Sequence, residues 1–139
     1  MDAFPPGGNS TDVDRSGAPI VDNAGRSVYY VEGPTTHTVA RFPTIGGARQ
    51  YFEEDRDRNL ARGRSEKLAP KEATFRGMVA DQQFLLCDEN LCIYRARYQE
   101  YAIMVAANMG PNMTGEALNK VIMAVDRKMT ECLARPLRK

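Results

Sequence analysis

Apolar residues that recur at helical intervals between positions 75 and 133 constrain the fold of this chain more than any other feature. Steps of three and four residues separate the members of one central seam, which is the spacing that a buried helix face needs. The seam consists of Leu91, Tyr94, Tyr98, Tyr101 and Val105. We therefore expect a helical core in residues 70–139. The pattern leaves open whether 75–109 is one helix or two.

A second helix is expected after the stop at Gly110 and Pro111. Its apolar positions run at helical spacing from Leu118 to Leu133, and Glu116 lies in the first turn, where a carboxylate is favoured. Because only a short link joins the two helices, they should pack as antiparallel neighbours. The predicted fold class is mainly α, with a C-terminal antiparallel helical hairpin or small bundle.

The residues before this core divide into a β-ribbon and a charged helix. Between 20 and 43, short apolar runs alternate with turn-forming residues, which predicts a short β-ribbon. From 44 to 69, acidic and basic residues are densely mixed, as is typical of a solvated helix or a linker. Pro70 ends any continuation of that helix, so the helical core is expected to begin there.

Residues 1–19 are expected to form an extended, intrinsically flexible N-terminal arm. The run Pro5-Pro6-Gly7-Gly8 is followed by polar residues, and the whole segment has too little apolar surface to offset the entropy cost of ordering. A segment of this kind becomes ordered when it lies along another protein. The arm therefore indicates a partner.

The charge balance argues against nucleic acid as the main partner. The 139 residues include 19 Lys or Arg and 18 Asp or Glu, for a net charge of +1. This is not the basic excess of a nucleic-acid-binding domain. Arginine is much commoner than lysine, and its planar guanidinium suits contacts with carboxylates at protein interfaces. A GC-rich gene would produce the same excess.

Ten residues are candidates for a protein interface. Most belong to the Arg-rich stretch 41–64, where four interleaved acids largely cancel the field that nucleic acid would need. Two more arginines flank the tyrosines of the seam. The candidates are Arg41, Arg49, Tyr51, Phe52, Arg56, Arg58, Arg62, Arg64, Arg95 and Arg97.

The sequence contains no pattern that indicates catalysis, a metal or a cofactor. His37 is the only histidine, and it lies in a Thr-rich expected strand without the Ser and Asp of a catalytic triad near it in sequence. We therefore expect an ordinary surface histidine. A zinc site of His37 with the three cysteines is disfavoured, because Cys87 and Cys92 are separated by four residues within an expected helix. We therefore expect a protein that is not an enzyme and that has no cofactor.

The cysteines and the N-terminus also bear on localisation. Cys87, Cys92 and Cys132 have no regular disulfide spacing, and the first ten residues lack the apolar core of a secretory signal. No apolar run approaches the ~20 residues of a membrane helix. We expect a reducing intracellular compartment, either the cytoplasm or a virion assembled there, with no secretion and no membrane span.

Together these patterns favour a non-enzymatic structural or interaction subunit of a large multiprotein assembly. The most specific form of this hypothesis is a minor capsid or virion accessory protein that binds its neighbours through the N-terminal arm and the helical hairpin. One alternative is a small regulatory adaptor that binds protein or nucleic acid through residues 41–64. Another is an accessory subunit of an organelle complex. The sequence does not identify the partners.

Overall fold

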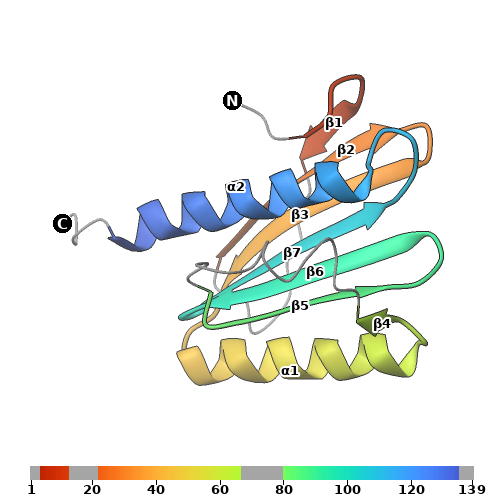
Figure 1. Ribbon diagram of the computed structural model, residues 1–139. Helices are drawn as coiled ribbons and strands as arrows, with labels where there is room; N and C mark the ends of the chain where they lie inside the picture. The colour runs from red at the N-terminus through yellow and green to blue at the C-terminus, as the bar shows by residue number, and fades with distance from the viewer. Residues whose placement is uncertain (1–3, 13–21, 67–79, 135–139) are drawn as a thin grey trace.

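The computed structural model describes residues 4–12, 22–66 and 80–134, which form one β-sheet and two α-helices (Figure 1). The strands are β1 (Asn9–Asp12), β2 (Asp22–Tyr30), β3 (Gly33–Arg41), β4 (Ser65–Glu66), β5 (Gln82–Cys87), β6 (Leu91–Tyr98) and β7 (Tyr101–Asn108). The helices are α1 (Ile45–Ala61), between β3 and β4, and α2 (Gly115–Ala134), after β7.

The strands lie in the order β1-β2-β3-β7-β6-β5-β4, and each neighbouring pair is antiparallel. Two meanders, β1-β2-β3 and β5-β6-β7, therefore meet where β3 pairs with β7, for example at Thr38 opposite Met104. Helix α1 follows the first meander, and Thr44 caps its start by accepting a hydrogen bond from the Gly47 amide. The short strands β1 and β4 form the two margins of the sheet.

The prediction of a mainly α fold is wrong, because the residues expected to form the first helix of the hairpin form β5, β6 and β7. The error has a physical cause. Both faces of β6 and β7 are largely covered, so β7 is apolar from Tyr101 to Ala107 and shows no period of two. In β6 the alternation is limited to Tyr94–Tyr98, and its polar members, Arg95 and Arg97, are themselves buried. A tight turn at Gln99 and Glu100 then joins β6 to β7. Apolar residues of two strands thus fell by chance at intervals of three and four.

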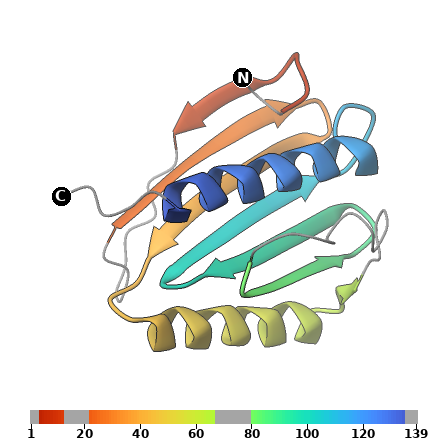
Figure 2. The ribbon, with the colours of Figure 1, turned by 60° about the vertical axis from the view of Figure 1, so that its left-hand side comes forward.

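The two helices pack on opposite faces of the sheet, with α2 across its middle strands and α1 beside β5 (Figure 2). Successive side chains of a strand point to opposite faces. On β6, Tyr94 and Tyr98 belong to the core covered by α2, whereas Ile93 belongs to the core that Phe52 of α1 covers. The residues that α2 contributes are Leu118, Val121, Ile122, Val125 and Met129.

Residues 4–12 pack on the sheet, which differs from the expected flexible arm. Strand β1 pairs with β2 from Asn9 opposite Tyr29 to Asp12 opposite Arg26. Ahead of it, Phe4 packs against the main core, and the Tyr30 hydroxyl donates a hydrogen bond to the Pro5 carbonyl oxygen over 2.6 Å. The other residues of the expected arm, 1–3 and 13–19, lie outside the described residues.

Candidate functional site

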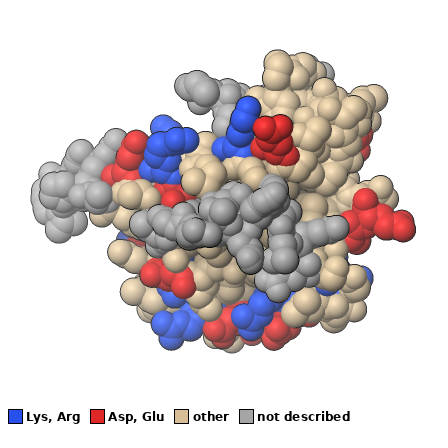
Figure 3. All heavy atoms as spheres, in the orientation of Figure 1, with Lys and Arg blue, Asp and Glu red and all other residues tan. Residues whose placement is uncertain are grey.

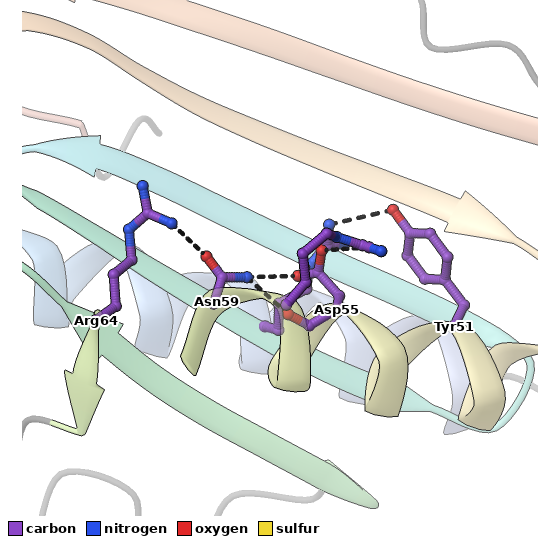
Figure 4. Close-up of polar contacts among 6 residues, drawn as sticks. Tyr51, Asp55, Asn59 and Arg64 are labelled. Carbon is purple, nitrogen blue, oxygen red and sulfur yellow. Dashed lines mark hydrogen bonds and ion pairs between the residues drawn. The ribbon is translucent and has the colours of Figure 1, made fainter. Parts of the chain in front are cut away.

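A buried ion pair joins α1 to the sheet (Figure 4). Arg95 of β6 donates from Nε to Oδ2 of Asp55 over 2.7 Å, and the Arg95 residue is 5% exposed. A terminal guanidinium nitrogen of Arg95 also donates to the Tyr51 hydroxyl over 3.1 Å, and the guanidinium carbon lies 5.0 Å from the centre of the Tyr51 ring. Since each charge has a partner, this arrangement holds α1 in place on the sheet.

The same network continues along α1 to the turn between β5 and β6. The Asn59 amide nitrogen donates to the Asp55 backbone oxygen over 2.8 Å and to Asp55 Oδ2 over 3.1 Å. Arg64 then donates from Nη1 to the Asn59 side-chain oxygen over 2.7 Å, and its Nε lies 3.4 Å from a carboxylate oxygen of Asp88. Side-chain hydrogen bonds and the Arg64–Asp88 ion pair thus connect the middle of α1 to the residue that follows β5.

A second cluster holds the other end of β5. Arg97, which is 6% exposed, donates from Nε to the Gln82 side-chain oxygen over 2.6 Å and from Nη1 to the Gln99 carbonyl oxygen over 2.9 Å. The Gln82 amide nitrogen in turn donates to Glu53 of α1 over 3.3 Å. Gln82 therefore connects this end of β5 to β6 and to α1, and Arg97 connects β6 to the turn that follows it.

The structure divides the predicted interface residues between interior and surface. Phe52, Arg95 and Arg97 are buried within the chain, and Tyr51 and Arg64 belong to the network on α1. The other five lie at exposed or half-exposed positions, and three of them have carboxylate partners. These five are Arg41, paired with Glu100, Arg56, paired with Asp57, Arg58, paired with Asp55, and the exposed Arg49 and Arg62.

Asp55 was not among the predicted site residues, although the sequence carries a signal for it. Ala48, Phe52, Asp55 and Asn59 follow at intervals of four, three and four, and they are the buried residues of α1. This spacing places an acid and an amide on the buried face of the helix. A buried acid on a helix requires a cation opposite it, and the candidate list already contained that cation, Arg95.

A tyrosine pair and an acid lie in the core under α2. Tyr98 donates to Asp126 Oδ1 over 2.6 Å, and Tyr94 donates to the Gln83 side-chain oxygen over 2.8 Å. Burial and the neighbouring Asp126 raise the pKa of both hydroxyls far above the usual value for tyrosine. Ala96, fully buried between the two tyrosines on the same face of β6, is the smallest side chain in that row. At neutral pH both tyrosines are therefore neutral hydrogen-bond donors.

His37 is half-buried and two cysteines form a disulfide, and both findings differ from the sequence interpretation. Desolvation, together with the charge of Arg26 on the adjacent strand, lowers the pKa of His37 to about 4, so the imidazole is neutral at pH 7. Cys87 and Cys92, directly opposite each other on β5 and β6, form a disulfide, whereas Cys132 is a free, exposed thiol. No group of three or more potential metal ligands occurs among the described residues.

Among the strands that the structure describes, one margin of the sheet has no partner strand over most of its length. Within the described part of the chain, β4 pairs only with Leu86 and Cys87, so nothing pairs with the outer side of Gln82–Leu85. The Asp88 amide donates to the Leu91 carbonyl, and opposed residues alternate between bonded and non-bonded pairs. The N–H and C=O groups of Gln83 and Leu85 therefore point away from β6.

This edge is a candidate site for binding a protein segment. Its four outward backbone groups form two donors and two acceptors in the geometry of a β-ladder. Charged residues and proline, which commonly block such edges, are absent from Gln82–Leu85. Clusters of acids and bases lie instead over α1, where Arg alternates with Asp and Glu on the face shown in Figure 3.

The comparisons with known proteins do not place this chain in a group. No protein-family model matches it, and no curated protein or solved structure is significantly similar to it. Neither helix in the described part of the chain is both long and apolar enough to cross a membrane.

Proposed function

We propose that this protein is a non-enzymatic interaction subunit that binds a partner protein by strand addition at the outer edge of β5. The observation that supports this proposal is the uncharged edge of Gln82–Leu85, which has no partner strand among the described residues. An extended segment of a partner would complete the ladder with main-chain hydrogen bonds. The assembly in this proposal is the one favoured by the sequence, a capsid or virion in which the protein is an accessory subunit.

The rigidity of β5 supports this proposal. Phe84 packs on Phe52 with 5.2 Å between ring centroids, Leu85 lies in the core under α2, and the disulfide at Cys87 ties the end of the strand to β6. An edge that keeps its conformation binds a strand with little loss of conformational entropy of its own. The affinity for the partner strand would therefore come from backbone hydrogen bonds of β5, and the buried side chains of β5 would keep its own register with β6 constant.

A matched pair of variants at Gln83 tests the proposal. Gln83→Pro removes an outward N–H that β6 does not use, and proline is tolerated at such edge positions. Gln83→Ala keeps the N–H, and both variants lose the side-chain acceptor for Tyr94. The difference between them therefore reports the backbone group alone.

The assay selects random eight-residue peptides displayed on phage against the purified chain and then measures the affinity of the enriched peptides by fluorescence anisotropy. We expect the peptides to bind the wild type and Gln83→Ala with similar affinity, and to bind Gln83→Pro about tenfold more weakly or worse. Equal affinity for the two variants, or a selection that enriches no peptide, would overturn the proposal. Unchanged far-ultraviolet circular dichroism of the proline variant is the control for folding.

A further inference from the structure

The opposite margin of the sheet contains a short strand that pairs, among the described strands, with β2 alone. β1 has only four residues, Asn9–Asp12, with the polar sequence Asn-Ser-Thr-Asp, and it pairs with the outer side of β2. By contrast, β2 itself is paired along all nine of its residues with β3. The pairing of β2 with the rest of the sheet therefore does not depend on β1.

The anchors of this strand lie just before it. The Arg26 guanidinium carbon is 4.6 Å from the centre of the Phe4 ring, and Tyr30 donates to the Pro5 carbonyl. Gly8 lies so close to β2 that an added Cβ would meet Val28 and would come within 2.8 Å of the Tyr30 ring. Besides the ladder between β1 and β2, the Phe4 ring, the Pro5 carbonyl and the close approach at Gly8 thus fit residues 4–12 to β2.

The connection from β1 to β2 is much longer than the path it must cover. Asp12 lies opposite Arg26, and β2 begins four residues earlier at Asp22, so the two ends are about 13 Å apart along the strands. Nine residues, 13–21, join them. Nine extended residues can span roughly 30–32 Å. The covalent connection therefore allows β1 to reach the β2 strand of a neighbouring molecule.

We propose that residues 4–12 can pair with β2 of a second copy of this chain, so that two molecules exchange their first strands. The occupant is defined by the structure itself, because the segment seen on β2 fits that strand and would make the same contacts in a second copy. Exchange of an identical element requires no new interface and is a low-cost route to a dimer. This inference concerns the β1 margin and is independent of the proposed strand addition at β5.

Cysteines placed on separate copies of the full-length chain detect the exchange. Thr11 and Ser27 are directly opposed, and the Cα atoms of such pairs are about 4.5–5.5 Å apart, which is close enough for a disulfide. The free Cys132 is first replaced by serine. A Thr11→Cys chain labelled with nitrogen-15 is mixed with an unlabelled Ser27→Cys chain at high concentration and oxidised mildly, and the products are identified by mass spectrometry.

We expect a covalent heterodimer of the two variants, because neither chain can form this disulfide alone. The matched control replaces Ser27→Cys with Ala40→Cys on β3, a position that pairs with β2 and β7 and is not adjacent to β1. Addition of Gly8→Val to both chains should reduce the heterodimer to the control level, whereas addition of Gln83→Pro should leave it unchanged.

Two results together would overturn the inference. One is a yield of heterodimer no greater than that of the Ala40→Cys control. The other is that a single chain carrying both Thr11→Cys and Ser27→Cys forms only the bond within itself at the same concentration. Such an outcome would mean that β1 pairs only with the β2 strand of its own molecule.

Discussion

Removal of Asp55 tests whether the ion pair under α1 determines stability. The Asp55 carboxylate accepts hydrogen bonds from Arg95 at 2.7 Å, from Arg58 at 3.0 Å and from Asn59 at 3.1 Å. In Asp55→Ala the Arg95 guanidinium stays buried and keeps its hydrogen bond to the Tyr51 hydroxyl, but it has lost its carboxylate partner. Loss of one member of a buried pair costs about 3–5 kcal/mol, because the remaining charge is uncompensated.

The assay is equilibrium unfolding in urea, followed by circular dichroism. We expect the free energy of unfolding of Asp55→Ala to fall by about 3–5 kcal/mol, and Tm to fall by roughly 10–20 °C for a chain of this size. The matched control is Asp57→Ala on the same helix, where the carboxylate is 72% exposed and lies 3.5 Å from Arg56. An exposed pair of this kind contributes less than about 1 kcal/mol.

A double-mutant cycle with Arg95→Met separates the contribution of the ion pair to stability from the change in helix propensity that alanine causes at position 55. If the cost of Asp55→Ala arises from the stranded charge, the double variant should recover much of the lost stability, because it buries no unpaired charge. The reasoning would be refuted if Asp55→Ala cost no more than Asp57→Ala, or if the effects of Asp55→Ala and Arg95→Met were simply additive.

Three further perturbations follow from the buried groups. Tyr98→Phe removes the donor to Asp126 and should lower the free energy of unfolding by about 1–3 kcal/mol in urea titrations; no measurable loss would contradict a buried bond. His37 has a folded pKa of about 4, below its value of 6.5 when unfolded, so the unfolded chain binds the extra proton. Stability should therefore fall by about 1–3 kcal/mol as the pH drops from 6.5 to 4, and His37→Gln should flatten that part of the profile. Joint replacement of Cys87 and Cys92 by alanine should cost about 2 kcal/mol from loop entropy, and a thiol reductant should then have no further effect on Tm.

The disulfide also changes how the sequence bears on localisation. The spacing of Cys87 and Cys92 matches no regular disulfide pattern, and for that reason the sequence favoured a reducing compartment. The structure pairs them because a four-residue turn makes them direct neighbours on two antiparallel strands. The compartment thus stays a prediction that the thiol state of the natural protein can test.

Local chemistry in the sequence was sufficient for the elements whose signals are local. Thr44 and the glycines after it mark the start of α1, and Gly110 and Pro111 precede the amphipathic segment that forms α2. Short apolar runs separated by turn residues likewise predicted strands before Phe42, where β2 and β3 are found. In each case capping, turn chemistry or periodicity lies within a few residues, and no distant contact is needed to interpret it.

The tertiary structure alone decided the rest. β6 is buried on both faces by helices that come from either side of it in the sequence, so its alternating Arg95 and Arg97 do not mark an exposed face. The adjacent β7 is a nearly continuous apolar run without the period of two by which a strand is recognised. The Asp55–Arg95 pair joins residues 40 apart, so neither residue shows its partner locally. Which residues lie inside, which edge is unpaired among the described strands and which cysteines meet depend on strand order, and strand order is a property of the assembled sheet.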